Sequence, residues 1–544
     1  MGLATLLRVS VRPVAGPSTP TLAVIGGGQL ARMMAQAAVA LGVPLRLLAE
    51  GPDVSAAQVV RDPLVGDYRD LPTLREAAEG CSVVTFDHEH VPTEHLHALT
   101  AEGHACRPGP EALVHAQDKA VMRERLDALG VPSPRHRLVT EVADVVAFAD
   151  TVGGFPVVLK TTRGGYDGKG VWVVSSGEES AVAFDVAAST GVRILAEEKV
   201  DFRRELSALV ARSPSGQVAA YPVVESVQRD GICWEVTAPA PDHDADLAVA
   251  AQRIAMHVAG ELDVTGILAV EMFETTDGRV LVNELAMRPH NTGHWSMDGA
   301  VTGQFENHLR AGLDLPLGSP QARAPWTVMV NILGGDHGEV SEDLYAGYPH
   351  VMARDPRLKV HLYGKDVKPG RKVGHVTAYG DDLDDDLALR AQRVAMRVAT
   401  ELGVTGILAV EMFETGDGRI LVNELAMRPH NTGHWTQDGA VTSQFENHLR
   451  AVLDLPLGVP DAREPWTVMV NILGGPVATG RLYDGYRHVL ARDPRLRVHL
   501  YGKEMRAGRK VGHVNACGDD LDDCLERARH AAAWFRGDLG ETSE

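Results

Sequence analysis

The stretch GILAVEMFETTDGRVLVNELAMRPHN, residues 266–291, predicts two β-strands joined by a hairpin turn. Counting outward from the Asp-Gly turn places Glu271 and Glu284 opposite each other on neighbouring strands. Two facing carboxylates repel each other unless a cation lies between them. Mg²⁺ is usually held by one or two carboxylates together with substrate phosphates, and Asn283 can add an oxygen. The stretch therefore predicts a magnesium site, and two carboxylates on a solvent-exposed face are the alternative.

Arg288 and His290 follow the second strand directly, so they are expected just beyond the two carboxylates. A guanidinium at this place can bind an oxyanion such as bicarbonate, phosphate or an acyl phosphate. For His290 the alternative is a structural hydrogen bond within a loop. The two side chains are candidates for stabilising a reacting anion.

The end of this stretch occurs twice, because LVNELAMRPHNTGHW is found at residues 281–295 and again at residues 421–435. The repeat extends much further. Residues 246–385 (copy one) match residues 386–523 (copy two) at an offset of 140, which becomes 138 after a small deletion. Solenoid repeats are far shorter, so this is a tandem duplication of a domain-sized segment. Its near-identity indicates a recent duplication or an error in the assembled gene.

Residues 21–50 begin with a short apolar strand, a Gly-Gly-Gly turn and a helical pattern. Gly26, Gly28 and Ala31 fit the fingerprint of dinucleotide-binding domains, but doubly wound domains that bind no dinucleotide use the same turn. The segment VVTFDHEHVP, residues 83–92, adds a buried strand that ends in polar residues. Together they predict an open α/β sheet with a ligand site at the carboxyl ends of its strands.

Two segments in the middle of the chain have features of a nucleotide site. Lys160 ends a predicted strand, and the glycine-rich loop at residues 164–170 follows it. A lysine charge beside exposed loop amides suits phosphates, whereas the alternative is a hairpin turn with a solvated lysine. A later strand ends in Glu197 and Glu198, which could offer backbone groups to a base edge and a carboxylate to ribose hydroxyls.

The 544-residue chain is long enough for about three or more domains. It has 53 Lys and Arg against 73 Asp and Glu, a formal net charge of -20. This charge argues against sequence-independent binding to nucleic acid or to an anionic membrane, and no apolar run reaches the roughly 18 residues of a membrane span. The segment 361–375 nevertheless holds a basic cluster, which suits a substrate phosphate or is a solvated turn; its members are Lys365, Lys368, Arg371 and Lys372.

Taken together, these motifs resemble the ATP-grasp superfamily and, within it, the N5-carboxyaminoimidazole ribonucleotide synthases. The resembling segments occur in the family order and cover about residues 20–385. They are IGGGQLARMM, TFDHEHVP, GGYDGKG, EEKVDFRRELS, YPVVESVQ, LVNELAMRPHNTGHW and LYGKDVKPGRKVGH.

The resemblance implies an ATP-dependent ligase of purine (IMP) biosynthesis. Such an enzyme uses ATP, Mg²⁺ and bicarbonate to make carboxyphosphate. Carboxyphosphate then carboxylates the exocyclic amine of 5-aminoimidazole ribonucleotide and leaves ADP and phosphate. The family also implies a cytoplasmic homodimer. The alternatives are another ATP-grasp carboxylate ligase or transformylase, or an inactive duplicated module.

The resemblance also implies roles for residues. For ATP these are Lys119, Lys160, Gly165, Tyr166, Asp167, Gly168, Lys169, Gly170, Glu197, Glu198, Lys199, Val200, Glu205, Gln228, Asn283 and Glu284. For the ribonucleotide they are Gly27, Gln29, Tyr166, Asp167, Lys365 and Arg371. For carboxyphosphate they are Arg288 and His290, and for Mg²⁺ they are Glu271 and Glu284, or the copy-two equivalents Glu411 and Glu424. Gln228 stands where relatives can carry His, which puts that nucleotide contact in doubt.

The implied fold class is mixed α/β and α+β. The expected divisions are a disordered lead-in (1–20), a Rossmann-like, doubly wound pre-ATP-grasp domain (21–116), an ATP-grasp domain (117–315), a small β-rich C-terminal domain (316–385), a duplicated ATP-grasp half (386–455) and a duplicated C-terminal domain (456–544). The Lys160 strand and its loop occur once, so at most one complete active site is expected. We expect copy one to complete it because copy one follows the family order. The alternatives are that copy two docks on residues 20–240, or that copies exchange between chains.

Overall fold

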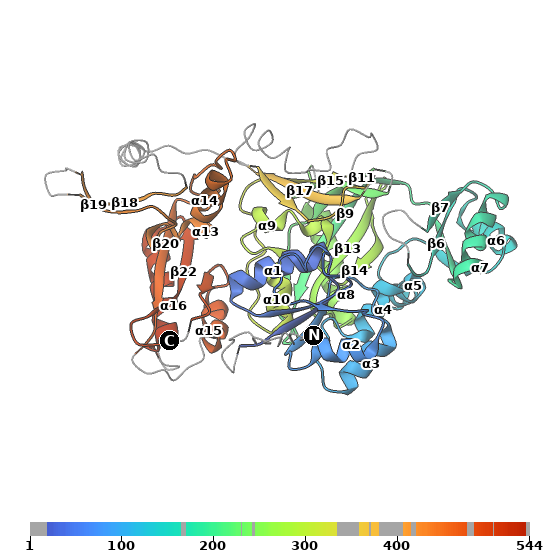
Figure 1. Cartoon of the computed structure of the whole chain (residues 1–544). Coiled ribbons are helices and arrows are strands. Elements are labelled where there is room, and N and C mark those ends of the chain that lie inside the picture. Colours follow the sequence, from blue (N-terminus) through green and yellow to red (C-terminus); the bar gives the residue numbers. More distant parts are fainter. Residues whose placement is uncertain are drawn as a thin grey trace, which may run out of the picture.

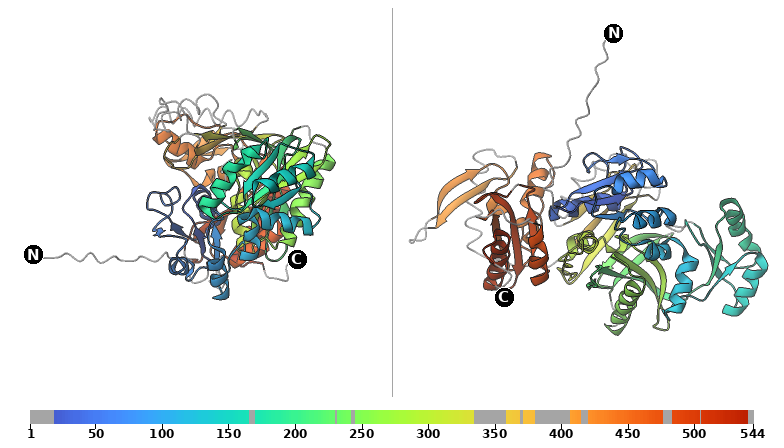
Figure 2. Two further views of the ribbon diagram at one scale, coloured as in Figure 1. Left: turned by 90° about the vertical axis from the view of Figure 1, so that its right-hand side faces the viewer. Right: turned by 90° about the horizontal axis from the view of Figure 1, so that it is seen from below.

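The structure is a computed structural model of the chain. It describes residues 19–164, 170–229, 231–241, 245–333, 358–368, 371–379, 406–414, 420–475, 483–503 and 505–539. The expected lead-in lies almost wholly outside these residues. Figures 1 and 2 show an N-terminal domain, a small lobe and a large sheet, with copy two on the side opposite the small lobe. No helix among the described residues is long and apolar enough to cross a membrane.

The N-terminal domain contains the predicted open α/β sheet, with parallel strands in the order β3-β2-β1-β4. Its elements are β1 (Leu22–Ile25), α1 (Gln29–Leu41), β2 (Leu45–Ala49), β3 (Leu64–Val65), α2 (Leu71–Ala78), β4 (Val83–Phe86), α3 (Thr93–Ala101) and α4 (Pro110–Gln117). The glycine turn before α1 is required by space, because a Cβ at Gly28 would lie 2.1 Å from Asp87 Oδ2. Asp87 also accepts a hydrogen bond of 2.7 Å from the Ala31 amide. The polar end of β4 is thereby fixed against the start of α1.

The small lobe is an antiparallel sheet in the order β5-β8-β6-β7 with two helices on one face (Figure 1). Its elements, together with the helix that leads into it, are α5 (Lys119–Ala128), β5 (His136–Val139), α6 (Val142–Val152), β6 (Val157–Thr161), β7 (Val171–Val174), α7 (Ala181–Thr190) and β8 (Ile194–Glu198). Along β6 the side chains alternate: Val157 and Leu159 enter the core with α6 and α7. Val158 and Lys160 therefore face the opposite side, which lines a cleft.

The large sheet has the order β14-β13-β9-β11-β12-β15-β17-β16, with β10 paired to β9. Its strands are β9 (Phe202–Arg212), β10 (Val218–Ala220), β11 (Val224–Arg229), β12 (Ile232–Ala238), β13 (Gly266–Thr275), β14 (Val280–Ala286), β15 (Thr327–Leu333), β16 (Lys359–Leu362) and β17 (Lys372–Tyr379), and its helices are α8 (Ala245–Glu261), α9 (Ser296–Gly299) and α10 (Gln304–Gly312). The C-terminal strands of copy one continue this sheet, because β15 pairs with β12. They cover the edge of β12 that would otherwise expose unpaired backbone groups. The expected domain boundary near residue 316 is therefore not a break in the sheet.

Copy two has the same local elements in different surroundings. They are β18 (Ala409–Glu414), β19 (Ile420–Ala426), α13 (Thr436–Gly439), α14 (Gln444–Val452), β20 (Trp466–Leu473), α15 (Asp484–Arg492), β21 (Arg497–Leu500), β22 (Lys510–Gly518) and α16 (Leu521–Arg536). In copy one, β13 pairs with both β14 and β9. Among the described residues, β18 and β19 pair only with each other. Within the described ranges, the duplicated hairpin therefore lacks the third strand that completes its counterpart.

This difference changes the exposure of identical side chains. In copy one, Met287 and Leu309 are each 0% exposed. Their copy-two equivalents Met427 and Leu449 are 58% and 59% exposed. Copy one is covered by the N-terminal domain, since α1 packs on α10, and the chain has only one such domain. Copy two therefore exposes apolar side chains that are buried in copy one.

Candidate active site

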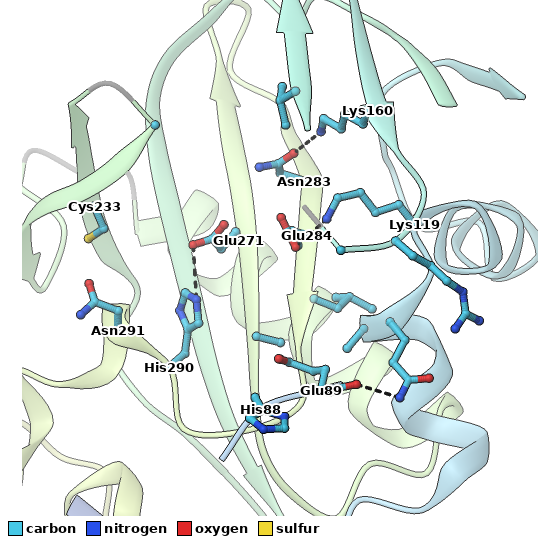
Figure 3. Close-up of a pocket in the computed structure, with 18 of the residues that line it drawn as sticks. His88, Glu89, Lys119, Lys160, Cys233, Glu271, Asn283, Glu284, His290 and Asn291 are labelled. Atoms are coloured by element: carbon cyan, nitrogen blue, oxygen red, sulfur yellow. Dashed lines mark hydrogen bonds and ion pairs between the residues drawn. The ribbon is translucent and has the colours of Figure 1, made fainter. Parts of the chain in front are cut away.

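A deep cleft of about 1470 Å³ lies where the N-terminal domain, the small lobe and the large sheet meet. Pockets for single small ligands usually measure about 300–1,000 Å³, so this cleft has room for more than one substrate. Its lining comes from the segment after β4, the helix-free face of the small sheet, and β13 and β14 of copy one. Figure 3 shows the central part of this lining.

Glu271 and Glu284 are register partners on β13 and β14, as the hairpin pattern predicts. A β-bulge adds Asn283 as an extra residue, because Met272 pairs with Val282. Strand alternation would turn one of two consecutive side chains away, but the bulge lets both Asn283 and Glu284 line the cleft (Figure 3). The hairpin therefore presents three oxygen-bearing side chains to one cleft.

The electrostatics of this hairpin favour a cation. Burial, together with the carboxylates of Glu284 and Glu205, raises the pKa of Glu271 to about 7. Although burial opposes it, the Lys119 ammonium holds the pKa of Glu284 below its ordinary value. The two facing carboxylates thus share one lysine, and Glu271 remains without a cation in contact among the described pairs. Its oxygens are suited to a hard divalent ion.

Two lysines face the hairpin across the cleft (Figure 3). Lys119, the first residue of α5, has its Nζ 2.7 Å from Glu284 Oε1. Lys160 has its Nζ 3.0 Å from Asn283 Oδ1 and 2.7 Å from Glu197 Oε2. Ammonium groups on one wall and carboxylates on the other suit a phosphate chain that is neutralised from both sides.

Arg123, which is fully buried in α5, joins the two walls. Its Nε lies 2.7 Å from Glu197 Oε1, and its Nη atoms donate to the backbone carbonyls of Val282 and Asn283 at 3.0 and 2.8 Å. Against the effect of burial, Arg123 and Lys160 lower the pKa of Glu197 to about 2. The Glu197 carboxylate is therefore held as an anion by these two cations. The backbone groups at the end of β8 are left to hydrogen-bond the edge of a base.

Beyond the hairpin, two side chains approach the carboxylates from the loop after β14. Arg288 Nε lies 2.8 Å from Glu89 Oε1, and His290 Nε2 lies 3.8 Å from Glu271 Oε1. His290 Nδ1 is 2.9 Å from Thr292 Oγ1. Burial and the charge of Arg288 lower the pKa of His290 well below its ordinary value, so the imidazole is neutral. A positive guanidinium and a neutral imidazole thus border the same part of the cleft.

The N-terminal domain and copy one also meet at the cleft. Lys365, between β16 and β17, donates from its Nζ to Gln29 Oε1 at the start of α1. Arg371 lines the same cleft. Gly27 donates its amide to Glu50 Oε2 at 2.9 Å and is not among the lining residues, whereas Gly28 is. The contact of Gly27 with a substrate stays a prediction.

The structure brings most predicted site residues to this cleft. They are Gln29, Lys119, Lys160, Glu197, Glu198, Lys199, Val200, Glu205, Gln228, Glu271, Asn283, Glu284, Arg288, His290, Lys365 and Arg371. Glu198 is also paired with Arg135 at 2.7 Å. Gly170 ends the glycine loop and accepts a hydrogen bond from the Thr161 amide. The other predicted loop residues, Gly165, Tyr166, Asp167, Gly168 and Lys169, lie outside the described residues.

Arg123 was not predicted as a site residue, because it lies in an ordinary amphipathic helix with no local motif. Glu89 had a partial signal, because it belongs to the polar cluster after a predicted strand. Its partnership with Arg288 depends on two segments about 200 residues apart, and only the fold reveals that.

Copy two repeats the hairpin but not the cleft. Glu411 and Glu424 are register partners, and His430 Nδ1 lies 3.6 Å from Glu411 Oε1. The elements that carry Lys119 and Lys160 occur once, and both lysines contact copy one. Within the described ranges, the complete set of site elements therefore surrounds copy one.

Family models match the chain in three ways. The ribonucleotide synthetase preATP-grasp domain matches residues 19–117. The ATP-grasp domain matches residues 124–305 and again 358–445, and the phosphoribosylaminoimidazole carboxylase C-terminal domain matches residues 327–388 and again 467–527. The second matches fall within or extend into copy two.

Individual relatives agree with these models. The N5-carboxyaminoimidazole ribonucleotide synthase of Mycobacterium tuberculosis is 54% identical over 67% of this chain and 84% of its own. The Aspergillus clavatus synthase complexed with ATP has a TM-score of 0.61 and 32% identity, covering 66% of this chain and 94% of its own. The same synthase with ADP and 5-aminoimidazole ribonucleotide has a TM-score of 0.61 and 31% identity, with the same coverage. The chain therefore belongs to the N5-carboxyaminoimidazole ribonucleotide synthase family of ATP-grasp enzymes.

Proposed function

We propose that this chain carboxylates 5-aminoimidazole ribonucleotide with bicarbonate at the expense of ATP, giving N5-carboxyaminoimidazole ribonucleotide, ADP and phosphate in purine biosynthesis. The observation that carries the proposal is the single cleft in which the Lys119 and Lys160 wall faces the Glu271–Glu284 hairpin of copy one. Relatives bind ATP, or ADP with the ribonucleotide, in solved structures. The cytoplasm is the compartment that we propose for this biosynthetic step.

The lysine wall is the proposed site of the ATP phosphates. Lys119 and Lys160 now contact Glu284, Asn283 and Glu197, and a phosphate chain would take over part of these contacts. Glu271, Glu284 and Asn283 form a suitable oxygen set for Mg²⁺, which supplies positive charge against the phosphates when bound. The raised pKa of Glu271 supports this fit, because a nearby cation would favour its ionised form.

The transfer step is proposed to lie beside Arg288 and His290. Bicarbonate oxygen attacks the γ-phosphorus of ATP, the bond to ADP breaks, and carboxyphosphate forms. The Arg288 guanidinium is suited to hold this anion while Glu89 fixes its orientation. The ribonucleotide amine then attacks the carboxyl carbon, and phosphate leaves. Gln29, Lys365 and Arg371 are the proposed contacts for the ribonucleotide, because they line the adjoining end of the cleft.

The duplicated hairpin supplies a matched test of this assignment. We expect Glu284→Gln to lower bicarbonate-dependent, ribonucleotide-stimulated ADP release by about 10²-fold or more, since a carboxylate that would hold Mg²⁺ beside the phosphates is lost. Glu424→Gln, the same change in copy two, should leave the rate within about twofold of the unchanged chain. A loss of activity only with Glu424→Gln would assign the reaction to copy two.

Substrate replacement separates the proposed reaction from its alternatives. Release of ADP should require bicarbonate and the ribonucleotide, and formate should not replace bicarbonate. Turnover with formate would indicate a transformylase instead. A folded chain with no ATP turnover under either condition would contradict an enzymatic function and favour an inactive duplicated module.

A further inference from the structure

Copy one and copy two contact each other through equivalent residues, and they do so in both directions. Up to β15 a copy-one residue corresponds to the copy-two residue 140 positions later, and from β16 onward to the one 138 positions later. By this correspondence Asp298 matches Asp438, and Arg323 matches Arg463. The contacts between the copies can therefore be tested for reciprocity, pair by pair.

The first reciprocal pair joins arginines to backbone carbonyls. Arg323 donates from Nη1 to the Asp438 carbonyl at 3.3 Å, and Arg463 donates from Nη1 to the Asp298 carbonyl at 3.1 Å. Each arginine is also held by two backbone carbonyls of its own copy. The equivalent arginine of each copy thus makes the same two kinds of contact. It donates to two backbone carbonyls of its own copy and to one backbone carbonyl of the other copy.

The second reciprocal set is ionic. Lys359 Nζ of copy one lies 2.8 Å from Glu446 of copy two. Arg497, the copy-two equivalent of Lys359, lies 2.7 Å from Glu306, the copy-one equivalent of Glu446. Burial opposes ionisation, yet Lys359 lowers the pKa of Glu446 and Arg497 lowers that of Glu306. Both ion pairs are therefore charged in the native fold.

A third pair accompanies the second. Lys359 Nζ lies 3.4 Å from Thr442 Oγ1, and Arg497 Nη1 lies 3.5 Å from the equivalent hydroxyl of Thr302. Three reciprocal pairs, six contacts in total, are more than one accidental encounter of two surfaces would produce. Reciprocity of this kind defines an isologous interface, in which residue i contacts j and j contacts i about a two-fold axis.

The centre of the contact agrees with a two-fold arrangement. Residues close to such an axis lie near their own equivalents. Burial and the charge of Arg463 are the two largest reasons why the pKa of Arg323 falls to about 10. The Arg463 guanidinium also lies 5.4 Å from the ring centre of Tyr379 in copy one. Arg323 and Arg463 therefore influence each other, as equivalent residues near such an axis would.

We infer that copy two occupies the place of a second subunit. The chain therefore contains, within one polypeptide, an interface of the kind that joins two identical subunits. The partner that fits the Asp298, Glu306, Arg323 and Lys359 surface is another copy of the same segment, and the chain supplies it. The duplication thereby gives the expected family homodimer a different form, which is one chain with an internal pseudo-two-fold axis.

Covalent connection favours the contact within the chain over the contact between chains. A tethered partner has an effective concentration that reaches the order of 1 mM for a short flexible link, well above a micromolar solution. The N-terminal domain adds a further hold on copy two, since Tyr486 Oη donates to the Leu41 carbonyl at 2.8 Å. Tyr486 and Leu41 also share one hydrophobic core. Copy two is therefore anchored on both sides.

Carbodiimide cross-linking of the full chain tests this inference. The reagent activates the Glu446 carboxyl, Lys359 Nζ attacks it, and an amide forms as the urea leaves. Lys119 and Glu284 provide a matched internal control, because their atoms are 2.7 Å apart, against 2.8 Å for Lys359 and Glu446, and their side chains are 12% and 41% exposed. Those of Lys359 and Glu446 are 7% and 38% exposed. Both linked peptide pairs should form with comparable yield.

Mixing chains labelled with ¹⁴N and ¹⁵N decides whether the link lies within one chain. We expect only unmixed Lys359–Glu446 peptides, together with a sedimentation mass of one chain at micromolar concentration. Lys359→Arg should abolish this cross-link, because a guanidinium forms no such amide, and leave the Lys119–Glu284 link unchanged. Mixed-isotope Lys359–Glu446 peptides would overturn the inference in favour of exchange between chains. Absence of that link in the unchanged chain, with the control link present, would overturn it as well.

Discussion

At the scale of single residues, the fold places ionisable side chains of the site where burial or neighbouring charges disfavour their charged forms. Glu271 is the clearest case, because burial and two neighbouring carboxylates raise its pKa from an ordinary 4.5 to about 7. In the unfolded chain the carboxyl ionises near 4.5, but in the folded chain it keeps its proton until about pH 7. Between these values the folded state binds more protons, so the stability falls as the pH rises.

Glu271→Gln therefore has a predicted pH signature. The amide cannot ionise, so the substitution should stabilise the chain at pH 8, where the full cost of the charged carboxylate is present. At pH 4.5 it should have little effect, because the carboxyl is then protonated in the folded chain. Urea denaturation at the two pH values, without nucleotide or metal, measures the difference. An equal effect at both would contradict the raised pKa.

Arg123 is the residue on which both walls of the cleft depend. Removing it leaves the buried Glu197 carboxylate with only Lys160 and frees two carbonyls of β14. We expect Arg123→Ala to lower the free energy of unfolding by about 3–5 kcal/mol, the usual cost of breaking a buried ion pair. Arg125→Ala is the matched control in the same helix, because its pair with Glu261 is exposed, and it should cost about 0.5 kcal/mol or less. Similar urea midpoints for the two variants would contradict the anchoring role.

The sequence predicted residue chemistry well where the partner is local. Glu271 and Glu284 could be paired because a short turn fixes the register between them. The bulge at Asn283 was not predicted, although it is a property of the hairpin itself, because the β18–β19 hairpin, which has no third strand among the described residues, has the same register shift. Arg123 and Glu89 have partners far away in the chain, so no local pattern could indicate those contacts.

At the scale of elements, α10 and α14 compare nearly the same helix in two environments. Leu309 in α10 is fully buried, whereas Leu449 in α14 is mostly exposed. Leu309→Ala should cost about 2–5 kcal/mol, because it leaves a cavity in a packed core. Leu449→Ala should cost about 0.5 kcal/mol or less. Urea denaturation of the two variants checks this, and equal losses would mean that α14 is buried in solution.

The elements themselves were largely predictable, since strand, turn and helix signals are local. Their assignment to sheets was less so. A family model matches the predicted C-terminal domain, but the local pattern did not indicate that its β15 pairs with β12 and extends the central sheet. Nothing in the local pattern of β15 distinguishes it from β20, which lies in a separate three-stranded sheet. Whether such a strand joins the central sheet depends only on whether an open strand edge is available to it.

At the scale of the whole molecule, the chain has one N-terminal domain and two segments able to dock on it. Copy one takes that place and leaves apolar side chains of copy two exposed, including Met427, Leu449 and Leu453. The folded chain should therefore bind a hydrophobic dye such as 8-anilinonaphthalene-1-sulfonate. Leu449→Lys combined with Leu453→Lys should lower the dye fluorescence severalfold without changing ADP release. Unchanged fluorescence would place the dye elsewhere.

The reciprocal contacts between the copies have a consequence for how this surface can evolve. In a symmetric dimer of identical chains, one substitution alters both ends of the interface at once. Here a single codon alters one end only. The two ends already differ, because Lys359 faces Glu446 where Arg497 faces Glu306, and Tyr379 stands where copy two has Cys517. Each copy can therefore acquire substitutions that the other copy lacks. The two ends of the interface, which were equivalent after the duplication, can become different one residue at a time.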